Sequence, residues 1–519
     1  MRYHVLGIGS IGTLVAHNLR LAQPSADVTL VLRQVQKFVN PVLKGGEDNV
    51  KGPTLQVAQN GGDTTTTTGY EIDACSTGRL AGLAAAADKG LLSAVNAGGH
   101  IDSLIVCTKA PATSSAIAGL RSRIGPSTVI ALLQNGMGVY DELCDKFWPE
   151  PAKRPHFILG TTTHGVTAGA QRGSVLHMSK PGQGAVKWGV APDPRGKVDF
   201  EDWLWGADVG SLPALTPPPS PSLPLPPPPP GTGMENLHAT LTALLSMSPL
   251  SPSLLPMPHL YNELLIKLAV NATINPLTAV LGGGYLPNGS LHRSGPATRL
   301  VRQSVQETSE ILTAYVHNLA APRTAAPDTV RLFSYSNLLH RVNSVIAATR
   351  DNKSSMAIDV QHGRMTEIDY INQFLVNLGA RLKVPTPVHK MLTQMVKFKA
   401  EVAGLNKELY PVSPVRSGEE DALAVRRLGL EERRIALEER SMSLRESRRD
   451  EALAAKRAKI KLRKRVRDEE AAAATLGLTG SDSAGARSDS GGSDPSSPAS
   501  PASSQGQVSS SQGEVSEAR

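Results

Sequence analysis

The first 22 residues limit the possible folds more than any other stretch: a short β-prone run, then Gly7, Gly9 and Gly12, then an amphipathic helical pattern. The motif GxGxxG between a strand and a helix is the dinucleotide-binding fingerprint. Its glycines permit a tight turn, let the backbone approach a pyrophosphate, and let the helix pack close to the strand. The helix N-terminus, with Ser10 and Ile11, then faces the negative charge. The sequence therefore predicts an α/β Rossmann domain.

Polar residues also stand where three further predicted strands end. The strand at 27 to 33 ends in Arg33, the next apolar strand ends at Lys109, and another breaks at Asn135. Ligands of open parallel sheets bind at the carboxyl ends of strands, so we expect all three beside the glycine turn. An NAD enzyme usually has a carboxylate where Arg33 stands, whereas an arginine suits a 2′-phosphate, so NADP(H) is favoured over NAD(H). The alternative is an ordinary exposed arginine.

The domain organisation follows from length and composition. A chain of 519 residues is too long for one compact core, and its 38 prolines and 4% aromatic content indicate that part of it is not folded. The stretch PPPSPSLPLPPPPPGTG can form neither a helix nor an internal strand, so it is either an uncommitted spacer or a ligand for a proline-binding domain. The predicted regions are a Rossmann domain at 1–190 with a small-residue insertion at about 40–100, a proline-rich insertion or linker at 206–258, an all-α domain at 259–410, a charged helical extension at 411–470 and a disordered tail at 471–519.

The all-α region contains a row of polar residues on an apolar helix. Prolines separate candidate helices at 259–280, 296–320, 328–350, 354–376 and 385–405. In the first, Lys267, Asn271 and Asn275 recur at every fourth position, which places them along one face. Their neighbours are apolar, and a buried lysine is rare unless it is paired or functional. The alternative is a lysine that snorkels to water, with asparagines that cap or cross-link neighbouring elements.

Reduction of a carbonyl group would use such a lysine. Hydride that reaches a ketone carbon leaves negative charge on the oxygen, and a positioned ammonium both stabilises that charge and supplies the proton. Lys267 is the candidate donor, and Asn271 and Asn275 could hold hydroxyl or carboxylate groups of a substrate.

A second group of candidates lies between residues 352 and 375. Ser354 and Ser355 stand at a predicted helix start, and Glu367 lies just ahead of Asp369. Exposed helix caps and first-turn acids would explain these residues equally well. The pattern alone leaves their role open.

The net charge of +8 is confined to one segment. Eight of the twelve residues from Lys456 to Arg467 are basic, which equals the whole excess, so the folded part carries no overall basic signal. Clustered Lys and Arg bind phosphate groups or act as a nuclear-import address, but this run has no aromatic residues and is followed at once by three acidic residues. Nucleic acid would therefore be a partner of the tail alone.

Other features bear on assembly and compartment. Leucines recur every seven residues from Leu423 to Leu444, but the companion column is mostly arginine, which favours a solvated helix over a dimerisation zipper. The sequence leaves a homodimer open. Cys75, Cys107 and Cys144 show no pairing or metal spacing, which suggests a reducing compartment. We expect neither a membrane span nor an N-terminal signal, and we expect a cytoplasmic protein, with mitochondria and nucleus left open.

The motifs together resemble the ketopantoate reductase family. GIGSIG, LVLR, VCTKA, LLQNGMG, GTTTHG, KLAVNATINPLTA, PNG, KSSMAIDV and GRMTEIDYINQFL are similar to that family in order and approximate spacing, over most of residues 1 to 410. The resemblance implies a Rossmann domain followed by a helical domain of the 6-phosphogluconate dehydrogenase type. It also implies NADPH-dependent reduction of a small 2-keto acid, 2-dehydropantoate, to pantoate, a step toward pantothenate and coenzyme A.

The resemblance also assigns roles to residues. Lys267 would be the general acid, and Glu367 would orient that lysine or the ligand. Asn271, Asn275 and Asn288 would hold the substrate, and Ser355 would bind its carboxylate. The cofactor site would be lined by Gly7, Gly9, Gly12, Arg33, Lys109 and Asn135.

The chain departs from the usual family pattern in three places. The segment between Asn275 and Asn288 contains LGGGY and is a few residues longer than the common family form. The polyproline stretch falls just before the lysine helix, and the charged extension and tail are additions. Two alternatives therefore remain, a reductase of another 2-keto acid and a non-catalytic scaffold that acts through its basic tail.

Overall fold

The computed structural model describes residues 1–32, 53–75, 99–169, 171–180, 182–193, 195, 199–206, 217–281, 286–319 and 327–409. The predicted charged extension at 411–470 and tail at 471–519 lie outside the described residues, as does Arg33. Residues 1–412 form one compact unit, and the account below concerns that unit.

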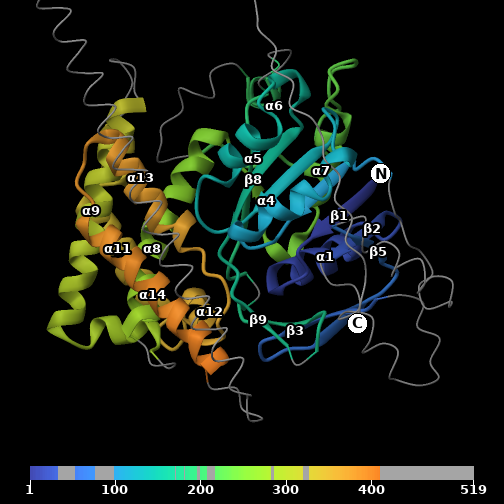
Figure 1. The fold of residues 1–519 in the computed structure, drawn as a ribbon. Helices are drawn as coiled ribbons and strands as arrows, with labels where there is room; N and C mark the ends of the chain where they lie inside the picture. The colour runs from blue at the N-terminus through green and yellow to red at the C-terminus, as the bar shows by residue number, and fades with distance from the viewer. Residues whose placement is uncertain are drawn as a thin grey trace, which may run out of the picture. The chain divides into compact units, whose positions relative to one another are not determined.

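The first domain is built on an eight-stranded sheet (Figure 1). Its strand order is β12-β11-β8-β7-β6-β1-β2-β5, and the six strands from β5 to β8 run parallel. That arrangement is the order of the dinucleotide-binding fold, so the predicted Rossmann domain is confirmed. The strands are β1 (Arg2–Leu6), β2 (Asp27–Leu32), β5 (Glu71–Ala74), β6 (Ser103–Val106), β7 (Val129–Leu133), β8 (His156–Thr162), β11 (Val186–Val190) and β12 (Pro252–Leu254).

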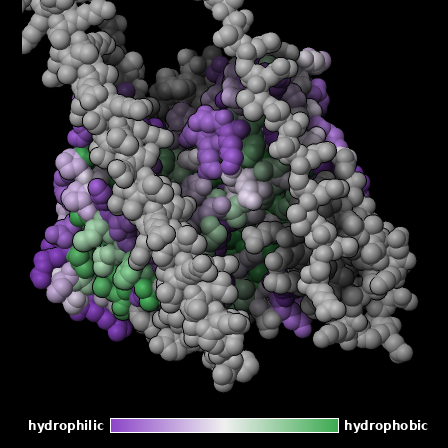
Figure 2. Space-filling model, viewed as in Figure 1, coloured by the Kyte–Doolittle hydropathy of each residue, from purple (hydrophilic) through white to green (hydrophobic). Residues whose placement is uncertain are grey.

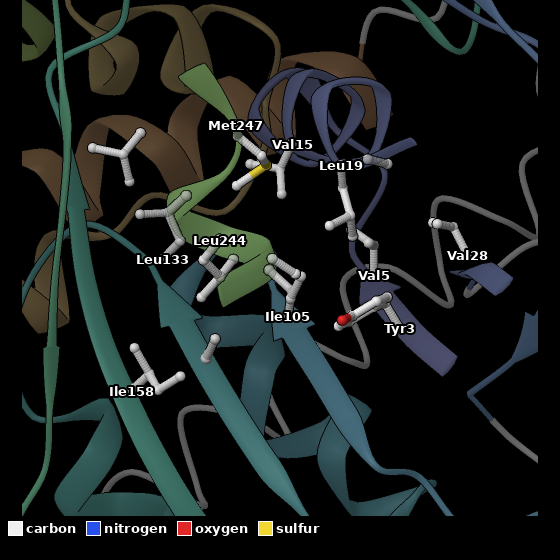
Figure 3. Close-up of a cluster of buried hydrophobic side chains, with 14 of the residues drawn as sticks. Tyr3, Val5, Val15, Leu19, Val28, Ile105, Leu133, Ile158, Leu244 and Met247 are labelled. Carbon is white, nitrogen blue, oxygen red and sulfur yellow. The ribbon is translucent and has the colours of Figure 1, made fainter. Parts of the chain in front are cut away.

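Helices cover both faces of this sheet because successive strand residues point to opposite sides. On one face, Val5, Ile105 and Leu133 pack with Val15 and Leu19 of α1 (Ser10–Ala22) (Figure 3). On the other face, the intervening residues pack with α4 (Ala110–Ala118) and α5 (Val139–Phe147). Short helices α6 (Phe200–Trp205), η2 (Arg121–Arg123) and η3 (Pro151–Lys153) complete the domain.

The predicted linker at 206–258 is wrong for its second half. Residues 234–254 belong to the first domain, as α7 (Glu235–Leu245), η5 (Ser248–Leu250) and β12. Leu237, Leu241 and Leu244 lie on one face of α7 and are 0 to 1% exposed in the core beside α1. The adjoining proline run hid this helical spacing because it set the composition of the whole stretch.

A second, four-stranded sheet packs against α1. It contains β4 (Thr64–Thr67), β3 (Leu55–Gln59), β10 (Ser174–His177) and β9 (Val166–Ala168), in that order. Its two hairpin pairs come from insertions after β2 and after β8. The predicted insertion at 40–100 thus supplies β3, β4 and the edge strand β5, and its residues 40–52 and 76–98 lie outside the described residues.

The second domain is helical and is centred on α8 (Met257–Leu281), which packs against α9, α11, α12 and α14. Three predicted helices are confirmed, as α8, α9 (Gly295–Leu319) and α14 (Pro387–Leu409). The predictions of single helices at 328–350 and 354–376 are wrong. The first is divided into α10 (Pro327–Leu332) and α11 (Tyr335–Ala348), with Ser334 at the start of α11. The second is divided into α12 (Ser355–Gln361), η7 (Ile368–Tyr370) and α13 (Asn372–Leu382), because Gly363 turns the chain at φ +57°. The remaining short helix is η6 (Asn288–His292).

The environment of α8 differs from that of α14. By length and composition α8 could cross a membrane, but 72% of its apolar window is buried inside the protein, as expected for the core helix of a domain. By contrast, α14 carries exposed apolar side chains, and Phe398 is 68% exposed. Figure 2 shows an apolar patch on the surface of the helical domain.

A candidate active site at the carboxyl edge of the sheet

The glycine turn after β1 has three different spatial requirements. Gly7 has φ +92°, and a Cβ there would lie 2.6 Å from the amide nitrogen of Thr108. A Cβ on Gly12 would collide with the carbonyl oxygen of Gly7. A Cβ on Gly9 would meet no atom of the described residues within 4 Å, so this position faces open space in the described part of the chain. The turn therefore leaves room for a ligand at Gly9, whereas the backbone is closely packed at Gly7 and Gly12.

The start of α1 fits a pyrophosphate. Within the part of the chain that the structure describes, no side chain caps this helix, and its first turn contains no acidic residue. The N–H groups of the first helical turn, which begins with Ser10 and Ile11, have no hydrogen-bond partner within the helix. They lie at the N-terminal end of α1, next to the open position at Gly9. Unpaired amides and the helix dipole favour an anion there, so the residues present fit a dinucleotide.

Register brings the other loops to the same edge. Leu6 of β1 is level with Val106 of β6, which is level with Leu132 of β7, so the residues after these strands are neighbours. The side chain of Gln134 donates to the Thr108 carbonyl oxygen at 2.8 Å, which ties two of the loops together. The structure thus brings Lys109 and Asn135 to the edge that carries Gly7.

Glu367 of the second domain joins this edge. One carboxylate oxygen accepts from the backbone N–H of Ala110 and the other from the side-chain amide of Asn135, each at 3.2 Å. Burial raises the pKa of Glu367, and these hydrogen bonds and Lys109 oppose that rise. A buried carboxylate therefore connects the cofactor loops of the first domain to the second.

Lys109 is held in the same interface. Its ammonium forms an ion pair with the carboxylate of Asp359 on α12, which also pairs with Arg364 at 3.2 Å. Asp359 was not among the predicted site residues, although it lies four positions after Ser355 in the KSSMAIDV motif. On α12 that spacing places it one helical turn from the predicted serine.

The side chain of Lys267 is partly buried, and its ammonium is directed toward the first domain. Its Nζ donates to the carbonyl oxygen of Thr162, the last residue of β8, at 2.7 Å. Burial lowers the pKa of Lys267 to about 8, and the negative charge of Glu367 opposes that effect. The hydrogen bond to Thr162 directs the ammonium to the backbone of the first domain, which argues against a lysine that snorkels to water.

A cavity of about 310 Å³ lies beside Lys267. Lys187 and Glu263 form an ion pair of 2.9 Å in its wall, and the buried hydroxyl of Thr161 has no hydrogen-bond partner among the described residues. The cavity thus combines polar groups with room for small molecules next to an ammonium. Its lining residues are Thr161, Thr163, Gly184, Ala185, Lys187, Glu263 and Lys267.

The predicted substrate residues have different environments. Asn275 is buried and Asn271 partly buried on α8, and neither side-chain amide has a hydrogen bond to the described part of the chain. Asn288 donates from its amide to Thr349 at 2.9 Å, while its buried Oδ1 has no partner among the residues described. Ser355 is exposed in the first turn of α12.

The neighbouring Ser354 has a structural role. Its hydroxyl oxygen accepts from the amide of Ala357 at 3.1 Å, which caps α12, and from the hydroxyl of Thr278 at 2.7 Å. For Ser354 the helix-cap interpretation is therefore confirmed.

Comparison with known proteins decides the family. Residues 3–193 match Ketopantoate reductase PanE/ApbA, and residues 260–400 match Ketopantoate reductase PanE/ApbA C terminal. The chain is 30% identical to the 2-dehydropantoate 2-reductase of Escherichia coli O157:H7 over 299 residues, which are 57% of this chain and 74% of that one. This chain belongs to the ketopantoate reductase family.

Other relatives agree with this membership. A probable 2-dehydropantoate 2-reductase of Schizosaccharomyces pombe is 27% identical over 312 residues, 59% of this chain and 75% of that one. The structure of D-mandelate dehydrogenase with NADH and anilino(oxo)acetate has a TM-score of 0.52 at 19% identity, over 78% of this chain and all of that one. At this identity the second comparison supports the fold alone. The two family matches leave out residues 194–259 and 401–519.

Proposed function

We propose that this protein reduces 2-dehydropantoate to (R)-pantoate with NADPH, and that Lys267 is the general acid. The family membership and the position of Lys267 support this proposal. NADPH supplies the hydride when it is bound. The observation that carries the proposal is the partly buried Lys267, whose ammonium donates to the Thr162 carbonyl oxygen at the end of β8 and has a pKa lowered to about 8.

Lys267 would act on the keto oxygen of the substrate. As the keto carbon accepts hydride, its oxygen gains negative charge, which the ammonium stabilises by hydrogen bonding and then protonates. Lys267 is left neutral and takes a proton from water to complete the cycle. A pKa of about 8 suits this task, because the group is charged at neutral pH and still transfers its proton readily.

Glu367 would keep Lys267 charged and hold the two domains in register. Its negative charge raises the pKa of Lys267, which burial alone would lower further. Its hydrogen bonds to Ala110 and Asn135 hold the cofactor loops at a defined distance from α8. The amides of Asn271 and Asn275, the Oδ1 of Asn288 and the hydroxyl of Ser355 would then hold the hydroxyl and carboxylate groups of the substrate.

The glycine turn would bind the cofactor, with the pyrophosphate on the N-terminus of α1 and Ser10 and Ile11 next to it. Lys109 and Asn135 would line the same crevice. The preference for NADPH over NADH rests on Arg33, whose guanidinium suits a 2′-phosphate.

The test is NADPH oxidation with ketopantoate by the wild type and Lys267→Ala. The substitution should lower kcat by roughly 10² to 10⁴ if the lysine is the acid. Lys399→Ala is a matched control, since Lys399 also donates to a backbone carbonyl oxygen, that of Val280, at 2.6 Å in the same domain. Equal turnover by the wild type and Lys267→Ala would refute the assigned role.

The alternatives have their own readouts. A panel of 2-keto acids compared by kcat/KM tests the substrate: a higher value for another acid would assign that acid in place of ketopantoate. The same panel with NADH in place of NADPH tests the cofactor. A chain truncated after Leu409 tests the scaffold alternative. If that alternative holds, the intact protein has no activity and the truncation abolishes binding to an acidic partner such as RNA.

A further inference from the structure

Two histidines are buried in contact with each other close to the proposed acid. His164 lies in the turn after β8 and is 8% exposed, and His177 ends β10 and is 3% exposed. The Nε2 of His177 lies 2.9 Å from the Nδ1 of His164. Neither ring has a part in the proposed reaction as described above.

The partners of the two rings determine which nitrogens carry hydrogen. The Nε2 of His164 lies 3.0 Å from the carbonyl oxygen of Leu250, which can only accept, so this nitrogen donates. In a neutral ring Nδ1 of His164 then accepts, and Nε2 of His177 donates to it. The Nδ1 of His177 accepts in turn from the side-chain amide of Gln59 at 3.0 Å. The two rings thus form one chain of hydrogen bonds, and burial lowers the pKa of His177, which favours its neutral form.

The hydrogen-bond chain of the two histidines lies next to Thr162, whose carbonyl group accepts the hydrogen bond of Lys267. His164 follows Thr162 by two residues, and its backbone N–H donates to the Thr162 hydroxyl at 3.2 Å. Its ring also lies against Gly184, where an added Cβ would be 2.6 Å from Nδ1 of His164. The ring thus joins the end of β8 to η5, to the second sheet and to the wall of the cavity beside Lys267.

We propose that His164, held by His177, is a positioning residue for the proton donor: it fixes the Thr162 carbonyl group that directs the ammonium of Lys267. This inference rests on the proposed function. Among the described residues no hydrogen bond joins His164 to Lys267, so the proposed effect runs through the backbone of residues 162–164. A small displacement of a positioned group lowers the rate of a reaction, although binding elsewhere is unchanged.

The position of the Thr162 carbonyl oxygen also affects the charge of Lys267. A hydrogen bond to a carbonyl oxygen favours the ammonium over the neutral amine. Among the described residues, the charged groups close to Lys267 are Glu367 of the same domain and the Lys187–Glu263 pair in the cavity wall. Because the substitutions below leave these groups in place, a change in the Lys267 pKa reports on Thr162.

The test compares His164→Ala with a control on the same strand. His156, at the opposite end of β8, is 5% exposed and contacts the guanidinium of Arg195. We expect His164→Ala to lower kcat by about tenfold, to move the alkaline limb of the kcat profile to lower pH, and to leave the KM for NADPH unchanged. His164→Gln, which keeps a donor for the Leu250 carbonyl oxygen, should recover part of kcat, and His156→Ala should lose stability only.

A second readout needs no substrate. The rate of acetylation of Lys267, mapped by mass spectrometry as a function of pH, reports the Lys267 pKa in the wild type and in His164→Ala. A lower midpoint in the variant supports the positioning role. An unchanged midpoint, or His164→Ala with the kcat profile of the wild type, overturns it. Absence of ketopantoate turnover in the wild type overturns the proposed function instead, and the acetylation midpoints still decide the role of His164.

Discussion

The Nζ of Lys267 donates a hydrogen bond of 2.7 Å to the carbonyl oxygen of Thr162, which joins the core helix of the second domain to the last residue of a strand in the first. The two residues are 105 positions apart. Burial of the ammonium lowers its pKa to about 8, so the donor of this hydrogen bond titrates near neutral pH. Both the charge and the direction of the proposed acid therefore depend on how the two domains meet.

The first prediction concerns the pH dependence of turnover. The proposed acid must be protonated, so kcat should fall as pH rises through about 8, the lowered pKa of Lys267. An unperturbed lysine, with a pKa near 10.4, would leave kcat constant well above that pH. Steady-state kcat at saturating NADPH and ketopantoate across this range checks the prediction. A profile with no alkaline limb below pH 9 would contradict it.

The second prediction concerns stability. The pKa of Lys267 is lower in the folded protein than its ordinary value of 10.5, so between about 8 and 10.5 the unfolded chain binds more protons and stability rises with pH. Below that pH range Lys267 is charged in the folded protein, and the free energy of unfolding is reduced by the full cost of burying this charge. Lys267→Met should therefore raise the free energy of unfolding at pH 7 by roughly 1–3 kcal/mol, with a smaller gain at pH 10. Urea unfolding at the two pH values measures this, and an equal effect at both would contradict it.

The third prediction separates the charge of Glu367 from its hydrogen bonds. Glu367→Gln removes the negative charge that raises the Lys267 pKa, so the alkaline limb of kcat should move to lower pH and kcat at pH 8 should fall by about tenfold. Glu367→Ala also removes the hydrogen bonds to Ala110 and Asn135 and should in addition weaken NADPH binding. Kinetics and NADPH titration of both variants distinguish the two effects. Identical alkaline limbs in Glu367→Gln and the wild type would show that the charge has no such role.

Local patterns were enough to predict some parts of this molecule and not others. The glycine turn, α8 and the burial of Lys267 follow from spacing along short stretches. The contact of Glu367 with Asn135 joins residues 232 positions apart, and no local pattern encodes it. α7 was missed because the neighbouring proline run dominated the composition, although its leucines have helical spacing. The division of the helix predicted at 354–376 depends on Gly363, whose φ of +57° is evident only in the folded chain.

The fourth prediction uses two glycines of the same motif. Gly12→Ala should destabilise the first domain by more than about 2 kcal/mol, because the new Cβ would collide with the backbone of Gly7. Gly9→Ala should fold normally, since a Cβ there meets nothing within 4 Å, yet it should weaken NADPH binding by at least about tenfold because it fills the space for the pyrophosphate. Thermal unfolding without cofactor and NADPH titration measure the two effects. Equal cofactor affinity in Gly9→Ala and the wild type would contradict the placement of the pyrophosphate.

The last prediction tests whether the second half of the predicted linker is part of the first domain. Leu244 of α7 is fully buried against the sheet, so Leu244→Ala should lower the free energy of unfolding by about 2–5 kcal/mol (Figure 3). Leu223, in the proline-rich stretch before α7, is 42% exposed. Leu223→Ala should therefore change the free energy of unfolding by less than about 0.5 kcal/mol. Chemical unfolding of the two variants beside the wild type gives the comparison. If both substitutions had equally small effects, α7 would be a dispensable insertion, and the buried face that it shares with α1 would contribute nothing to the stability of the cofactor domain.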